Sequence, residues 1–148
     1  KSLLDFEPWR SDLWERIGRA YLNDESNQAA VDAFTMAERF GFLTNTGRIS
    51  QADAYLQNGD HETARQLLRT FPLGEAGLFE LMQVVALQRK IGDVYGAEAT
   101  LLAAHRMEPE NTEVNFLLGL MLSTTQPESA LQFLFSAENL DGNERDQS

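Results

Sequence analysis

The stretch that decides the fold runs from Asp12 to Leu22 and reads Asp-Leu-Trp-Glu-Arg-Ile-Gly-Arg-Ala-Tyr-Leu. Large, medium, small and aromatic side chains follow one another at spacings of three and four residues. Residues at these spacings lie on one face of an α-helix, so the stretch predicts a helix with one packed face. The same spacing continues through Ala30, Phe34 and Ala37, which predicts a second helix packed against the first.

The pattern recurs three more times along the chain. If Ser11 is position 1 of a repeat, the same frame starts again at Asn45, Leu78 and Thr112, at offsets of 34, 33 and 34 residues. Position 8 holds Gly18, Ala52, Val85 and Gly119; position 20 holds Ala30, Ala64, Ala97 and, after one turn residue is skipped, Ala130; position 24 holds Phe34, Leu68, Leu101 and Leu134. Small side chains let two helix axes approach closely, so the recurrence predicts four pairs of packed helices.

These residues resemble a known repeat family. Trp14, Ile17, Gly18, Tyr21, Ala30 and Phe34 are similar to the tetratricopeptide-repeat (TPR) pattern W-x2-L-G-x2-Y…A-x3-F, with Ile in place of Leu. The resemblance covers nearly the whole chain and implies an all-α fold, a right-handed α-solenoid of four helix-turn-helix repeats. The repeats are expected at 11–44, 45–77, 78–111 and 112–140, with a truncated preceding repeat or N-terminal cap at 1–10 and a polar tail at 141–148.

Eight helices are expected, near residues 11–24, 27–41, 45–58, 61–71, 75–91, 94–106, 111–124 and 127–140. Asn58-Gly59-Asp60 and Gly92-Asp93 mark turns, because Gly accepts a positive φ and Asp caps a helix N-terminus. Two positions of the second repeat depart from the pattern: Arg48 at position 4 and Gln51 at position 7 replace large apolar residues. Asn115 does so at position 4 of the fourth repeat. The departures in the second repeat make the packing of helix 45–58 an open question.

Composition excludes several classes of partner. The 148 residues carry 12 Lys and Arg against 23 Asp and Glu, a formal charge of −11 that repels nucleic acid and anionic membranes. The chain has no cysteine and no apolar run of about 18 residues, so neither disulfides nor membrane insertion is expected in this segment. Because the chain starts at Lys1, we expect a mature form or an excised fragment. The compartment stays open, with the cytoplasm as the default.

No catalytic constellation is apparent. Phosphate-loop, nucleophile-elbow, dinucleotide, metalloprotease and calcium-loop signatures are all missing, and His61 and His105 are the two imidazoles. For His61, packing is a better interpretation than metal binding, because no further ligands cluster near it in sequence. We therefore expect a non-enzymatic protein without cofactor or metal.

The resemblance implies a concave groove lined by the first helix of each repeat, at positions 2, 5, 9, 12 and 13. Glu15 falls on this lining, and the candidate peptide-binding residues are Arg19, Ile49, Asp53, Phe79, Met82, Arg89, Lys90, Phe116 and Leu120. The apolar members suit an amphipathic helix or an extended peptide, and the cations suit acidic side chains. The alternative is that the apolar members only pack between neighbouring helices. The Lys, Asn and Arg clamp with which some TPR proteins hold chaperone carboxylates is absent from its positions.

Two functional hypotheses follow. The first is a protein–protein interaction module that binds another protein or a peptide in the groove, within a larger protein. The second is a structural spacer or self-association domain, a homo-oligomer joined through its terminal repeats. Leu131 and Phe135 lie on the side of the last helix where a further repeat would pack, and Leu3 and Phe6 do so at the other end.

Overall fold

A computed structural model describes residues 9–123, 126, 128 and 130–137 of the chain. Within these residues the protein is all α-helical and has no β-strand, so the predicted fold class is confirmed. Leu3, Phe6 and the predicted polar tail at 141–148 lie outside the described residues. The chain divides into two compact units, Lys1–Pro72 and Leu73–Ser148.

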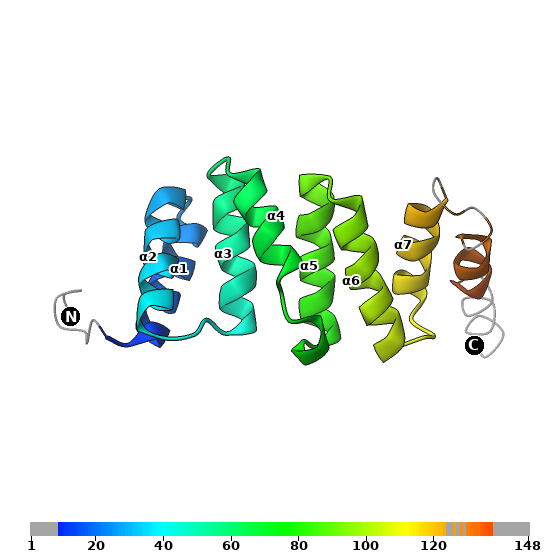
Figure 1. Cartoon of the computed structure of the whole chain (residues 1–148), viewed down its shortest axis with the longest axis horizontal. Helices are drawn as coiled ribbons and strands as arrows, with labels where there is room; N and C mark the ends of the chain where they lie inside the picture. Colours follow the sequence, from blue (N-terminus) through cyan, green and yellow to red (C-terminus); the bar gives the residue numbers. More distant parts are fainter. Residues whose placement is uncertain (1–8, 124–125, 127, 129, 138–148) are drawn as a thin grey trace. The chain divides into compact units, whose positions relative to one another are not determined.

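From residue 9 onward, the first unit contains four helices: α1 (Ser11–Asn23), α2 (Asn27–Phe40), α3 (Asn45–Gln57) and α4 (His61–Arg69). Helix α1 packs on α2 and α3, and α3 packs on α2 and α4 (Figure 1). All four begin where the sequence predicts and end within two residues of the prediction.

The core of this unit is the contact that the repeat pattern predicts. Ala30, Phe34 and Ala37 of α2 are fully buried, and Trp14 and Tyr21 of α1 pack against them. A Cβ atom on Gly18 would lie 2.9 Å from the Phe34 ring. Position 8 of the first repeat must therefore be small, because the Phe34 ring occupies the space beside it.

The second unit contains a short 3-10 helix η2 (Leu73–Glu75) and the helices α5 (Leu78–Ile91), α6 (Val94–Met107) and α7 (Thr112–Leu122). Residues 130–137 are also helical. Helix α6 packs on η2, α5 and α7. Helix α5 starts three residues later than predicted, because η2 forms a separate turn and Gly77 adopts an extended conformation as the N-cap of α5.

Small-to-large packing recurs at the end of this unit. A Cβ atom on Gly119 would lie 2.4 Å from Cγ of Leu134 and 3.3 Å from the Ala130 carbonyl oxygen. The helical residues 130–137 therefore approach α7 closely, through positions 8, 20 and 24 of the fourth repeat. Leu81, Val84 and Leu101 are fully buried within the same unit.

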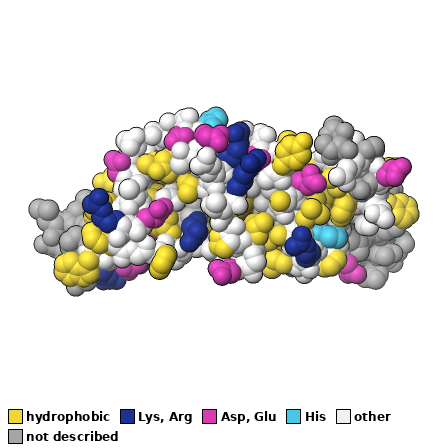
Figure 2. Space-filling model, in the orientation of Figure 1, with side chains coloured by type: hydrophobic (Ala, Val, Ile, Leu, Met, Phe, Trp, Pro, Cys, Tyr) yellow, Lys and Arg dark blue, Asp and Glu magenta, His cyan; other side chains and the backbone are white. Residues whose placement is uncertain are grey.

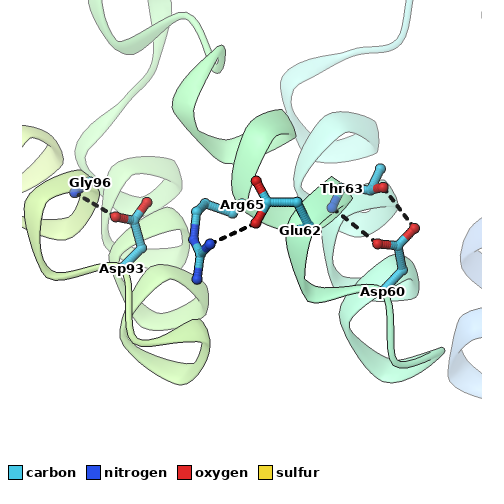
Figure 3. Close-up of polar contacts among 6 residues, drawn as sticks. All are labelled: Asp60, Glu62, Thr63, Arg65, Asp93 and Gly96. Carbon is cyan, nitrogen blue, oxygen red and sulfur yellow. Dashed lines mark hydrogen bonds and ion pairs between the residues drawn. The ribbon is translucent and has the colours of Figure 1, made fainter.

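The predicted capping residues begin the second helices of two pairs (Figure 3). Asp60 accepts a hydrogen bond from the Thr63 backbone N–H (3.1 Å) and another from its hydroxyl (2.7 Å). Asp93 accepts one from the Gly96 backbone N–H (3.1 Å). Gly59 and Gly92 precede these aspartates at φ values of 88° and 83°, where a side chain is strained.

The departures from the repeat pattern do not prevent helix formation. Gln51 is 4% exposed, and its side-chain amide donates to Oε1 of Glu38, so it ties α3 to α2. Asn115 is fully buried and donates from Nδ2 to the Pro109 carbonyl oxygen (3.0 Å). A buried polar group is tolerated when it has a partner, and both amide nitrogens find one on another segment. Oδ1 of Asn115 is buried without a partner among the described residues.

The two histidines differ in their surroundings. The interpretation of His61 as a packing residue is wrong, because this first residue of α4 is exposed to solvent. His105 is partly buried, and its ring meets Phe133 edge to face with centroids 5.3 Å apart. Such pairs are a common packing arrangement of aromatic rings.

Candidate peptide-binding groove

Exposed apolar side chains mark the second unit. On α5, Phe79 is 77% exposed; on α7, Phe116 is 49% and Leu120 is 47% exposed. Met82 on α5 is partly buried. Figure 2 shows hydrophobic side chains reaching one face over α5–α7, with charged side chains between them. These four residues are the predicted apolar lining of this unit, and solvent reaches all of them.

Part of this surface is hollowed. Arg89 and Leu120 line one pocket of about 260 Å³ together with Gly92, Val94 and Met121. Typical small-molecule pockets begin near 300 Å³, so this volume suits about one side chain of a ligand. The structure thus brings together two predicted groove residues that are distant in sequence.

Three residues of the pocket were missed by the sequence analysis. Val94 begins a second helix, Gly92 is the αL cap of α5, and Met121 neighbours a predicted position on α7. None of them falls on the groove positions of the repeat. The turn between α5 and α6 places Gly92 and Val94 there, and Met121 lies beside Leu120 on α7. Periodicity within one helix does not reveal such a turn.

Two cationic side chains lie on the same unit as this surface. Arg89 and Lys90 are exposed in the last turn of α5, where the partial negative charge of the helix C-terminus favours cations. Within the described part of the chain, neither side chain makes an ion pair or hydrogen bond. Both are therefore available to acidic groups of a ligand.

The predicted groove residues of the first unit are less accessible. Arg19 and Asp53 are partly buried, and Asp53 accepts a hydrogen bond from Gln57 Nε2 (3.1 Å) in the same helix. Ile49 is buried within the unit, at 7% exposure. Little of the Ile49 side chain is thus left for a ligand to contact.

Glu15 corrects one expectation about the lining. It does not face the groove: it is 6% exposed, and its carboxylate accepts hydrogen bonds from the Thr44 backbone N–H (2.8 Å) and hydroxyl (2.9 Å). The Thr44 oxygen in turn accepts from the Gly47 N–H (3.0 Å) and so caps α3. A Cβ atom on Gly47 would lie 2.1 Å from Glu15 Oε1, so this carboxylate fills the space beside the glycine.

The self-association residues that lie in the described part of the chain are solvent-accessible. Leu131 and Phe135, on the helical segment 130–137, are both exposed. Their exposure leaves an apolar patch on that helix.

Two other kinds of site are absent from the described residues. They contain no group of three or more His, Cys, Asp or Glu side chains placed to hold a metal ion. Among the same residues, no helix combines the length and the apolar character required to cross a bilayer.

Comparison with known proteins rests on structure. No protein-family model and no curated protein matches the chain. The structure is similar to the crystal structure of YrrB, described as a TPR protein with an unusual peptide-binding site, at a TM-score of 0.64 over 89% of this chain and 69% of that one. The protein has a TPR-like fold. Because the two sequences are 16% identical, the TPR likeness concerns the architecture of helical repeats.

Proposed function

We propose that the protein is a non-enzymatic interaction module that binds a peptide or helix of another protein. The observation that carries the proposal is the exposure of three apolar side chains in the second unit. Phe79 lies on α5, the helix that also presents Arg89 and Lys90. Phe116 and Leu120 lie on α7. The peptide-binding site named for YrrB supports this choice for a TPR-like fold.

An amphipathic segment with acidic residues fits this surface best. Burying a large apolar side chain completely contributes about 1.5–3 kcal/mol, so covering the exposed rings would supply much of the affinity. The Leu120 pocket admits one apolar side chain, and Arg89 at its wall pairs with a neighbouring carboxylate.

The test compares two groove variants with one control variant. A partner is first identified by cross-linking, and its dissociation constant is then measured by calorimetry for Phe79→Ala, Phe116→Ala and the control Tyr95→Ala. Tyr95 is exposed on α6 of the same unit, outside the predicted lining. We expect each groove variant to weaken binding at least about fivefold and the control to leave it unchanged. Equal affinities for all proteins, with intact helicity, would remove the groove from the proposal.

A second candidate function is self-association through the last helix, which the exposure of Leu131 and Phe135 favours. Sedimentation velocity at rising concentration tests it. If this patch joins two copies, Phe135→Asp yields a monomer, because a buried carboxylate without a partner opposes association. Tyr95→Asp is the control with the same charge change elsewhere. A wild-type protein that stays monomeric at high concentration contradicts this candidate.

A further inference from the structure

A second pocket lies within the first unit, away from the groove residues. The turn after α2, together with α3 and α4, encloses about 300 Å³. Its walls include Glu38, Phe42, Leu43, Arg48, Gln51 and Leu67. None of these residues occupies a groove position of the repeat, so the pocket is a separate feature of the surface.

The pocket coincides with the departure of the second repeat from the TPR pattern. Positions 4 and 7 hold Leu81 and Val84 in the third repeat, and both are fully buried. The second repeat holds Arg48 and Gln51 at these positions, and Arg48 remains partly exposed. The second repeat thus has a cation and an amide on the wall of a pocket at the positions where the third repeat has buried apolar side chains.

The guanidinium of Arg48 is the group in the pocket that lacks a partner. Glu38 already accepts a hydrogen bond from the buried Gln51 amide. No hydrogen bond or ion pair joins the Arg48 side chain to another residue among those the structure describes. A guanidinium offers a planar fork of N–H donors that matches the two oxygens of a carboxylate. The N–H donors of Arg48 are therefore free to pair with an added carboxylate, whereas Glu38, on the same walls, accepts from Gln51.

An aromatic side chain stands beside this cation. Phe42, in the turn after α2, is 92% exposed and lines the pocket, with the buried Leu43 next to it. An exposed phenylalanine leaves apolar surface in water, and an aromatic or apolar group that covers the ring would bury that surface favourably. A volume near 300 Å³ holds side chains rather than a folded element.

We propose that this pocket binds an acidic side chain of a partner protein that is adjoined by an aromatic residue. The carboxylate pairs with the guanidinium of Arg48, and the aromatic ring packs on Phe42. The residues at the repeat positions of the chaperone-type carboxylate clamp do not line this pocket, so the site is separate from the groove.

The test is an NMR titration of the full chain with two blocked dipeptides, acetyl-Phe-Glu-amide and its neutral match acetyl-Phe-Gln-amide. We expect the acidic probe to shift the backbone amides of residues 41–43 and 47–51 and the Arg48 Nε–H, and to bind at least about tenfold more tightly than the neutral probe, the size of a charge-assisted hydrogen bond.

Two variants sharpen the test. Arg48→Leu restores an apolar residue at position 4, so it should weaken the acidic probe about tenfold and leave helicity intact; if it does not fold, Arg48→Gln makes the same comparison. Glu38→Gln removes the one negative charge on the walls, so it should tighten the acidic probe and leave the neutral probe unchanged.

Equal binding of the two probes would overturn the proposal. So would unchanged binding of the acidic probe in a folded Arg48 variant. Shifts confined to α5 and α7 would also overturn it, because the probe would then occupy the groove.

Discussion

At the scale of single residues, buried polar side chains join the helices of this protein. Glu15 of α1 receives both hydrogen-bond donors of Thr44, the residue that caps α3. In the second unit the buried Thr100 hydroxyl lies 2.8 Å from Gln88 Oε1, which links α6 to α5. In each pair the polar atoms satisfy one another, so neither side chain is left unpaired inside the protein.

Replacing Glu15 by Ala should destabilise the protein. The Thr44 N–H and hydroxyl lose a carboxylate acceptor, and a hydrogen bond to a charged group contributes about 1.5–3 kcal/mol to the free energy of unfolding. Urea unfolding followed by circular dichroism measures the change. The control is Glu113→Ala, which removes an exposed carboxylate from α7 and should change the free energy by less than about 0.5 kcal/mol. Equal stability of the two variants would contradict the structural role of Glu15.

At the scale of the helix, capping decides where the second member of a pair begins. Asp60 accepts hydrogen bonds from the hydroxyl and the backbone N–H of Thr63, and these hold the pKa of its carboxyl below the usual 3.8. The neighbouring His61 acts in the same direction. The ionised form of Asp60 is therefore favoured more in the folded than in the unfolded chain.

This shift predicts a pH dependence of stability. The contribution of Asp60 is fully present above its unfolded pKa, near 3.8, and is lost as the pH falls through the lower folded pKa. Asp60→Asn keeps a capping side chain but does not titrate, so the difference in melting temperature between the wild type and this variant should change between about pH 5 and pH 3.

The control for this measurement is Glu110→Gln. Glu110 is exposed in the turn before α7 and makes no hydrogen bond through its side chain with other described residues. Melting curves of the three proteins at each pH separate the effect of Asp60 from that of the remaining carboxylates. A constant difference between wild type and Asp60→Asn across this range would contradict the assignment.

At the scale of the whole molecule, the helices form two compact units that meet in sequence between Pro72 and Leu73. In repeat proteins each repeat contacts only its neighbours, so stability is distributed along the chain. The right-handed stacking of all four repeats and the repeat boundaries inferred from the sequence stay predictions.

A core substitution in one unit should act mainly on that unit. Leu81→Ala removes a fully buried side chain of α5 and should cost about 2–5 kcal/mol. Hydrogen exchange measured by mass spectrometry should show faster exchange in α5, α6 and α7 and a smaller change in α1 and α2. Leu68→Ala in α4 is the reciprocal variant. An equal increase in both units for each variant would show one cooperative block instead.

The candidate site was partly predictable. A repeat frame assigns each residue to a face, and Phe79, Phe116 and Leu120, which it places on the groove, are exposed on their helices. Their role in binding stays a prediction. The same frame placed Glu15 and Ile49 on the groove, where the structure has both buried. A face defined by period does not say which neighbouring segment covers it. The Thr44 loop is such a segment for Glu15.

The helices, the capping aspartates Asp60 and Asp93, and the pairing of Gly18 with Phe34 and of Gly119 with Leu134 follow from the sequence alone, because they depend on the spacing of residues along the chain. Tertiary structure decided which polar side chains are buried and where pockets open. Gln51 is buried and donates a hydrogen bond to Glu38, whereas Arg48, on the same helix, lines an open pocket. These outcomes depend on contacts between separate helices, and such contacts exist only after the chain has packed.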